Sequence, residues 1–193
     1  MSQDKAGPEP GEYERILIIR LGALGDFVLS LRPMAAIRRH HPKAHITLLT
    51  TPPFAGLGRA SPYCDEVWID ARAPWWKPWR GLALARRLRR GRFQRVYDLQ
   101  TSGRTARYWR VMGRPEWSGH VAGASHAHVD PDRDTLHTVE RQKAQLRIAG
   151  IESVQAADVS WIDADVSRFD CKAPYVLFVP GGSAHRPKKR WPV

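Results

Sequence analysis

An aspartate and two glycines follow the first strongly apolar segment of this 193-residue sequence. The segment 16–19 is short and wholly apolar, which is typical of a central parallel strand covered on both faces. Gly22, Gly25 and Asp26 come next, and apolar residues at helical spacing follow them. Asp26 therefore falls where a strand gives way to a helix, the position at which open α/β sheets bind ligands. A carboxylate there could accept a proton from a substrate hydroxyl, or it could cap the helix.

A second segment of the same kind lies near the end of the sequence. The apolar run 174–180 leads into Gly181, Gly182 and Ser183, and Lys189 follows closely. Backbone amides in such a turn, together with a hydroxyl and a lysine, can bind a phosphate. A plain strand-to-helix turn is the alternative. A strand here would need a partner strand. The pattern is typical of the start of a second α/β domain.

Positive charge is concentrated in one window of the sequence. The chain has a formal net charge of +12, and residues 72–114 contain 13 basic residues against a single acid, Asp98. Tryptophans accompany the arginines in this window: Trp75, Trp76, Trp79, Arg86, Arg87, Arg89 and Arg90. The pattern predicts an anionic partner, which could be nucleic acid, a lipid headgroup or a phosphorylated saccharide. The alternative is that the arginines form the solvated face of a helix.

Strand and helix patterns alternate along the chain with short turns between them. This alternation predicts a Rossmann-like, doubly wound parallel α/β sheet over residues 15–172, preceded by a disordered tail at 1–14. Pro33 should bend the first helix, and Gly150 should end the last one. We expect strands at 16–19, 45–50, 66–70, 95–100 and 116–121, and helices after Gly25 and near 80–90, 101–112 and 137–148.

Several classes of protein and site are disfavoured. No apolar run approaches the ~20 residues of a membrane span, and no signal sequence is evident, so we expect a cytoplasmic protein. Cys64 and Cys171 lie far apart, which predicts neither a disulfide nor a zinc site. His120, His126 and His128 lack helical i, i+4 spacing, so a surface loop is favoured over a metal site.

Three functions are compatible with these features to different degrees. A dinucleotide-binding oxidoreductase is disfavoured, because Gly22 and Gly25 do not complete the GxGxxG spacing and no acid follows the second strand at Thr50. A nucleic-acid-binding module explains the arginines and tryptophans but not Asp26. A two-domain transferase, with an anionic acceptor on one lobe and a nucleotide-linked donor on the other, accounts for all of these features.

The sequence resembles glycosyltransferase family 9, the ADP-heptose:lipopolysaccharide heptosyltransferases. The resemblance lies in motifs that occur in the family's order and cover most of the chain after the tail: 15–33, 97–104, 137–141, 180–183 and 189–192. It implies a GT-B fold, in which residues 15–172 form the N-terminal, acceptor-binding lobe. Residues 173–193 would begin a truncated nucleotide-sugar-binding lobe, so the chain by itself is expected to be inactive.

The resemblance also implies roles for individual residues. Asp26 matches the family's proposed catalytic base, while Gly182, Ser183 and Lys189 match its donor-phosphate-binding residues. The acceptor-binding residues that we expect, some of which could instead serve a turn or a solvated face, are Gly25, Asp98, Gln100, Arg86, Arg87 and Arg90.

The implied reaction moves a heptose or a related sugar from an ADP-sugar to the anionic inner core of lipopolysaccharide. We expect no metal and no other cofactor. Together with the resemblance, the basic window implies contact with the inner face of the bacterial inner membrane, and no nucleic acid is expected as a partner. The alternative from another class is a basic nucleic-acid-binding module without catalysis.

Overall fold

The computed structural model describes residues 13–72, 78–170, 172 and 174–178. The chain divides into two units, Met1–Ile162 and Asp163–Val193, and each is described by itself. The motif residues Gly182, Ser183 and Lys189 lie outside the described residues, as do Trp75 and Trp76.

The first unit is built on a six-stranded sheet in which every strand pairs in parallel with its neighbours. The strand order is β3-β2-β1-β4-β5-β6, the order of a doubly wound Rossmann sheet, which confirms the predicted fold class. The strands are β1 (Arg15–Ile19), β2 (His45–Thr50), β3 (Glu66–Ile69), β4 (Arg95–Asp98), β5 (Glu116–Gly119) and β6 (His126–Ala127).

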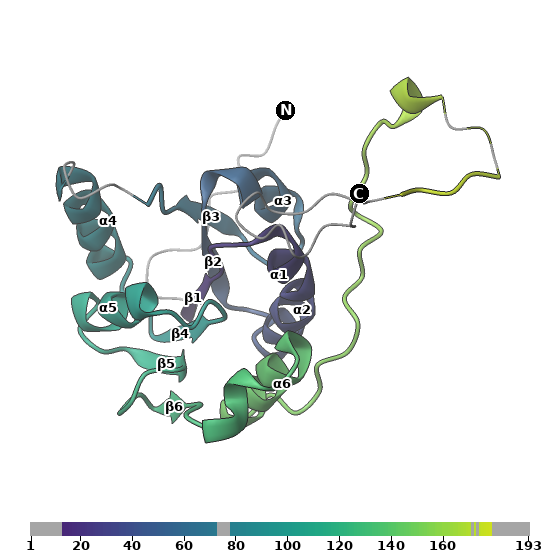
Figure 1. Ribbon diagram of the computed structural model, residues 1–193. Helices are drawn as coiled ribbons and strands as arrows, with labels where there is room; N and C mark the ends of the chain where they lie inside the picture. Colours follow the sequence, from purple (N-terminus) through teal and green to yellow (C-terminus); the bar gives the residue numbers. More distant parts are fainter. Residues whose placement is uncertain (1–12, 73–77, 171, 173, 179–193) are drawn as a thin grey trace, which may run out of the picture. The chain divides into compact units, whose positions relative to one another are not determined.

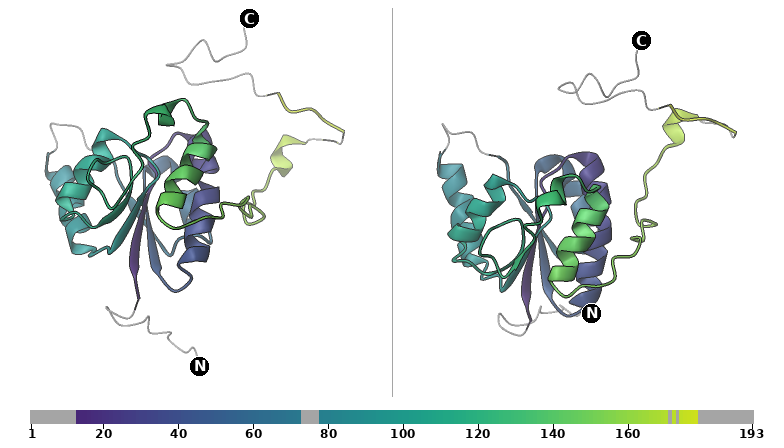
Figure 2. Two further views of the ribbon diagram at one scale, coloured as in Figure 1. Left: turned by 90° about the horizontal axis from the view of Figure 1, so that it is seen from below. Right: turned by 60° about the horizontal axis from the view of Figure 1, so that its bottom comes forward.

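Helices cover both faces of the sheet (Figures 1 and 2). One layer contains α1 (Leu24–Leu29), α2 (Leu31–His40), α3 (Ala55–Ala60) and α6 (Thr138–Ile148), and the other contains α4 (Pro78–Arg90) and α5 (Gly103–Val111). Short 3-10 helices lie at Pro52–Phe54 and Pro131–Asp134.

The alternation of side chains along β1 explains why helices cover both faces of the sheet. Ile16 and Ile18 point into one hydrophobic cluster with α1, α2 and α6, whereas Leu17 and Ile19 point into a second cluster with α4 and α5. All four side chains are fully buried. Alternate residues of a strand face opposite sides of a sheet, so an unbroken apolar run requires a cover on each side.

Two local predictions from the sequence agree with the structure. The first helix is divided at Ser30 into α1 and α2, and Pro33 lies in the first turn of α2, where its missing amide is tolerated. Gly150 has a φ of +83° after α6. The amides of Gly150 and Ile151 donate to the carbonyls of Arg147 and Leu146, so the helix ends in a Schellman motif.

The predictions at the histidines and at the second apolar segment were wrong in part. His126 lies in β6 and His128 is buried, because β6 adds a strand to the sheet edge where a surface loop was expected. In the second unit, the described part of the apolar segment, 174–178, has no strand and is exposed. A strand requires a neighbour to satisfy its amides and carbonyls, and none pairs with this segment among the described residues.

Candidate functional site

The centre of the sheet has a topological switch point between β1 and β4. The chain leaves β1 through α1 and α2 on one face and reaches β4 through α4 on the other (Figure 1). In sheets of this kind the crevice for ligands lies outside the carboxyl ends of these two strands. Asp26 follows β1 and the turn 98–101 follows β4, so the structure brings two of the predicted positions to this crevice.

Asp26 is held by a residue that directly follows β1. The guanidinium Nη2 of Arg20 lies 3.2 Å from Oδ2 of Asp26, and its Nη1 donates to the carbonyl of Leu99, which follows β4. Arg20 is 3% exposed, whereas the side chain of Asp26 is 45% exposed. Burial lowers the pKa of Arg20, and the facing Asp26 carboxylate counteracts part of this effect. Asp26 thus presents a carboxylate to solvent at the switch point.

The helix-capping interpretation of Asp26 does not hold. Helix α1 begins at Leu24 with Ala23 as its N-cap, and no side chain caps it. Asp26 lies in the first turn of the helix, and its carboxylate is directed to Arg20. Its side chain is therefore available for a role other than ending a helix.

The turn between β1 and Asp26 is fixed by side chains from three neighbouring segments. The backbone amide of Leu21 donates to Oε1 of Gln100 at 2.9 Å. The carbonyl of Leu21 accepts from Oγ1 of Thr51 and from Nη2 of Arg72, each at 3.0 Å. Gln100, predicted as an acceptor contact, therefore uses its side-chain oxygen to hold the turn beside Asp26.

Asp98 is also committed to local structure. It is 1% exposed, and its Oδ1 accepts from the amides of Gln100 and Thr101 at 3.1 and 2.8 Å. Burial raises the pKa of Asp98 to about 6, although hydrogen bonds from Thr105 and from these amides oppose the rise. This carboxylate holds the turn that follows β4, as the alternative interpretation of the sequence allowed. Its predicted contact with an acceptor stays a prediction.

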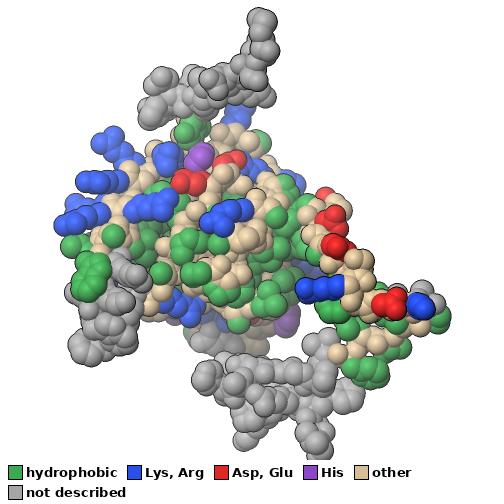
Figure 3. Space-filling model, turned by 90° about the horizontal axis from the view of Figure 1, so that it is seen from above, with side chains coloured by type: hydrophobic (Ala, Val, Ile, Leu, Met, Phe, Trp, Pro, Cys, Tyr) green, Lys and Arg blue, Asp and Glu red, His purple; other side chains and the backbone are tan. Residues whose placement is uncertain are grey.

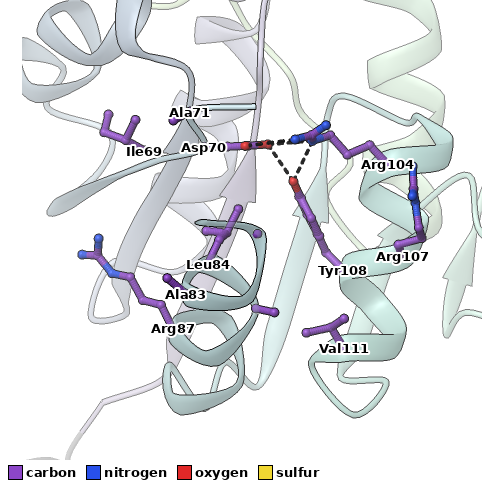
Figure 4. A pocket seen from close by; sticks show the side chains of 12 residues that line it. Ile69, Asp70, Ala71, Ala83, Leu84, Arg87, Arg104, Arg107, Tyr108 and Val111 are labelled. Carbon is purple, nitrogen blue, oxygen red and sulfur yellow. Dashed lines mark hydrogen bonds and ion pairs between the residues drawn. The ribbon is translucent and has the colours of Figure 1, made fainter. Parts of the chain in front are cut away.

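A pocket of about 560 Å³ lies between α4 and α5 at the carboxyl end of β3 (Figure 4). One wall carries a polar cluster, in which the buried carboxylate of Asp70 accepts from Nε of Arg104 at 2.9 Å and from the hydroxyl of Tyr108 at 2.6 Å. Burial and the Asp70 carboxylate raise the pKa of Tyr108. The exposed Arg107 and apolar side chains such as Leu84 line the remainder of the pocket.

A second pocket of about 420 Å³ borders the Leu21 turn itself. Gly22, Phe54 and Arg72 line it, and Asp70 and Ala71 line both this pocket and the pocket between α4 and α5. Gly22 has a φ of +123°, and a Cβ on it would lie 2.6 Å from the ring of Phe54. Only glycine fits both the backbone conformation and the space at this position.

The structure does not bring the predicted arginines of α4 to Asp26. Arg86, Arg87 and Arg90 line another pocket with Arg15, the first residue of β1. Arg86 and Arg90 thus lie toward the amino ends of the strands, whereas Arg87 also lines the pocket between α4 and α5. Arg87 pairs with Glu66, the first residue of β3, at 3.2 Å. Figure 3 shows Lys and Arg side chains gathered on the α4 side of the molecule. Any acceptor contact by these residues would be remote from Asp26.

The positive charge of the basic window is partly balanced by acids from elsewhere in the chain. Arg87 pairs with Glu66, as described above. Arg95 pairs with Glu116 at 2.8 Å, and Arg104 pairs with Asp70. Exposed arginines remain on both helices of this layer: Arg86, Arg89 and Arg90 on α4, and Arg107 and Arg110 on α5.

Sequence reasoning missed Arg20, Asp70 and the partners of Asp70. Arg20 is a charged residue directly after a fully apolar strand, and this pattern could have indicated it. A residue at that position lies beside the crevice at the carboxyl ends of the strands. Asp70 has the same signal after β3. Their partners Leu99, Arg104 and Tyr108 lie 34 to 79 residues away in sequence, so no local pattern indicates these pairings.

Comparison with known proteins places this architecture among solved structures. Neither a protein-family model nor a curated protein matches the sequence. A glycosyl transferase family 9 structure from Veillonella parvula matches with a TM-score of 0.74 at 22% identity, covering 93% of this chain and 56% of that chain. The chain has the fold of that glycosyltransferase structure. The resemblance suggested by the motifs is thus confirmed at the level of the fold.

Two further matches are heptosyltransferases. The ADP-heptose lps heptosyltransferase II of E. coli matches with a TM-score of 0.51 at 20% identity, covering 61% of this chain and 35% of that chain. E. coli heptosyltransferase WaaC with ADP matches with a TM-score of 0.54 at 18% identity, covering 77% of this chain and 50% of that chain. The chain spans about half the length of these structures or less.

Proposed function

We propose that this chain is the acceptor-binding part of a family 9 glycosyltransferase, which transfers a heptose or related sugar from an ADP-sugar to the anionic core of lipopolysaccharide. The observation that carries the proposal is the half-exposed Asp26 carboxylate at the switch point of a sheet with this family's fold. The names of the matched E. coli proteins support heptose as the sugar and lipopolysaccharide as the acceptor.

The proposed chemistry is a displacement at the anomeric carbon of the donor. The acceptor hydroxyl loses its proton to Asp26 as its oxygen bonds to the anomeric carbon, and the bond to the diphosphate breaks so that ADP leaves. A carboxylate can take that proton, since it needs only to lie within hydrogen-bond reach of the hydroxyl. By the motif resemblance, Gly182, Ser183 and Lys189 would stabilise the charge that grows on the diphosphate.

Contact with a membrane surface is part of the proposal. Helix α4 carries the exposed Trp79 and Leu82 in its first half and the exposed Arg86 and Arg90 in its second half, and this combination of cations and apolar groups suits an anionic lipid surface. Among the described residues, no helix has both the length and the apolar character needed to cross a membrane. We propose a peripheral contact, at the inner face of the bacterial inner membrane.

The direct test is a transfer assay with the longest chain that the gene encodes. ADP-heptose and a lipopolysaccharide core that lacks heptose serve as substrates, and mass spectrometry detects the added sugar. ADP-glucose and UDP-glucose serve as control donors. We expect transfer from ADP-heptose above both controls. Transfer from UDP-glucose alone would contradict the assigned donor, and no transfer from any sugar nucleotide would contradict the function.

A further inference from the structure

The pairing of Arg20 with Asp26 is asymmetric in a way that a surface ion pair is not. The arginine is buried to 3% exposure, while nearly half of the carboxylate side chain is in contact with solvent. Burying a guanidinium is costly unless it is paired and hydrogen-bonded. Arg20 meets part of this cost by donating from Nη1 to the Leu99 carbonyl and by forming an ion pair with Asp26 through Nη2, while its buried Nε has no hydrogen-bond partner among the described residues.

This geometry links the carboxylate to the sheet and not to its own helix. Helix α1 has six residues and no side-chain cap. Within the described part of the chain, Arg20 is the ion-pair partner of Asp26. The guanidinium is buried and hydrogen-bonded to Leu99, so its position is fixed, and its charge attracts the Asp26 oxygen that lies 3.2 Å away. The orientation of Asp26 is thus set by β1, which leads to Arg20, and by β4, which leads to Leu99.

We propose that Arg20 is a positioning residue for the transfer reaction. It holds Oδ2 of Asp26 and leaves Oδ1 to take the proton of the acceptor hydroxyl. This inference rests on the proposed function, since it deepens the role given to Asp26. Arg20 is buried and so offers little surface for a substrate to touch. Its effect on the reaction passes through the carboxylate, and that dependence distinguishes it from a residue that only stabilises the fold.

A double-mutant cycle on turnover tests the dependence. The four proteins are the wild type, Arg20→Met, Asp26→Asn and the double variant. Each is made as the longest chain that the gene encodes and is assayed with ADP-heptose and the heptose-free core. Arg20→Met should lower kcat by roughly 10- to 100-fold with the KM for donor little changed, because misplacement of a reacting group by about 1 Å has effects of this size. In the Asp26→Asn background, the same substitution should lower kcat no further.

The control is Arg95→Met, which removes another strand arginine from its ion pair with Glu116 at the amino end of β4. It should leave kcat unchanged. Arg20→Lys is the second variant for the cycle if Arg20→Met does not fold, because lysine keeps the charge but lacks the two-pronged geometry. It should also lower kcat.

The outcomes separate this inference from the function on which it rests. The positioning role alone would be overturned if Asp26→Asn were inactive while Arg20→Met kept full activity. It would also be overturned if Arg20→Met lowered kcat equally in the wild-type and Asp26→Asn backgrounds. A fully active Asp26→Asn would overturn the role of the base and the positioning role with it.

A second cycle measures urea midpoints of the same four proteins. The shift from Arg20→Met should shrink when Asp26 is already Asn, and additive shifts would contradict the pairing.

Discussion

At the scale of single residues, the acids near the carboxyl edge of the sheet differ in what their carboxylates contact. Asp98 and Asp70 are buried, and their oxygens accept hydrogen bonds from backbone amides and from neighbouring side chains. Asp26 is half-exposed and contacts a buried arginine. Reactivity toward a substrate requires an oxygen that solvent can reach, so Asp26 is the acid to test first.

Substitution of Asp26 separates catalysis from stability. Asp26→Asn and Asp26→Ala should both lower kcat by ~10² to 10⁴-fold, because each removes the group that accepts the proton. Both variants also leave the buried Arg20 without its charge partner, so we expect a modest and similar fall in melting temperature from each. Parallel turnover and thermal-unfolding measurements check this expectation. An active Asn variant would remove Asp26 from the chemistry.

Asp98 should make stability depend on pH. The folded protein binds the Asp98 proton more tightly than the unfolded chain does, because burial raises its pKa from 3.8 to about 6. Its contribution to the free energy of unfolding is thus favourable at low pH and is lost as pH rises from about 4 to about 6.

Asp98→Asn cannot titrate, so its stability relative to the wild type should improve by roughly 2 to 3 kcal/mol between pH 4 and pH 7. Urea unfolding of both proteins across this range measures the difference. Parallel pH profiles would show that Asp98 does not titrate in this range.

At the scale of elements, the turn between β1 and α1 is the feature that the fold constrains most tightly. Gln100, Thr51 and Arg72 reach the backbone of Leu21 from the segments that follow β4, β2 and β3. Gly22 then adopts a positive φ against Phe54. The position of Asp26 therefore depends on four strands of the sheet and not on the short helix that carries it.

Two glycines of this turn form a matched pair for a stability test. Gly22→Ala should destabilise the protein by about 1 to 3 kcal/mol, because its φ of +123° and its closeness to Phe54 both oppose a side chain. Gly25 lies in α1, and a Cβ there meets nothing within 4 Å. Gly25→Ala should be neutral or stabilising by up to ~1 kcal/mol. Thermal unfolding of the two variants checks the order, and equal effects would contradict it.

At the scale of the whole molecule, the acid-bearing crevice and the arginines of α4 lie toward opposite edges of the sheet. Asp26 follows the carboxyl end of β1, whereas Arg86 and Arg90 share a pocket with the residue that begins β1. One surface can thus contact an anionic layer while the other remains open to substrate. This separation favours attachment to a surface over direct substrate binding as the role of the α4 arginines.

Binding to anionic vesicles should depend on salt and on α4. Sedimentation with phosphatidylglycerol vesicles should weaken strongly between about 10 mM and 1 M salt, where the screening length falls from ~30 to ~3 Å. Changing both Arg86 and Arg90 to Gln should remove about 2 kcal/mol, a roughly 30-fold loss.

The matched control changes Arg39 and Arg147 to Gln, since both are exposed on the opposite helical layer. It should bind nearly as the wild type does. Equal losses in the two double variants, or equal binding to neutral phosphatidylcholine vesicles, would argue against a specific membrane surface on α4.

The sequence by itself determined five of the six strands of the sheet, most helices and the position of Asp26 after β1, because apolar periodicity and glycine turns act over a few residues. It also indicated the end of α6 at Gly150. Only the tertiary structure decided which side chains meet at the crevice. Arg20 reaches Leu99 across 79 residues of sequence, and Asp70 meets Arg104 across 34. Such contacts depend on strand order and on which face each crossover covers, and no short-range pattern carries that information.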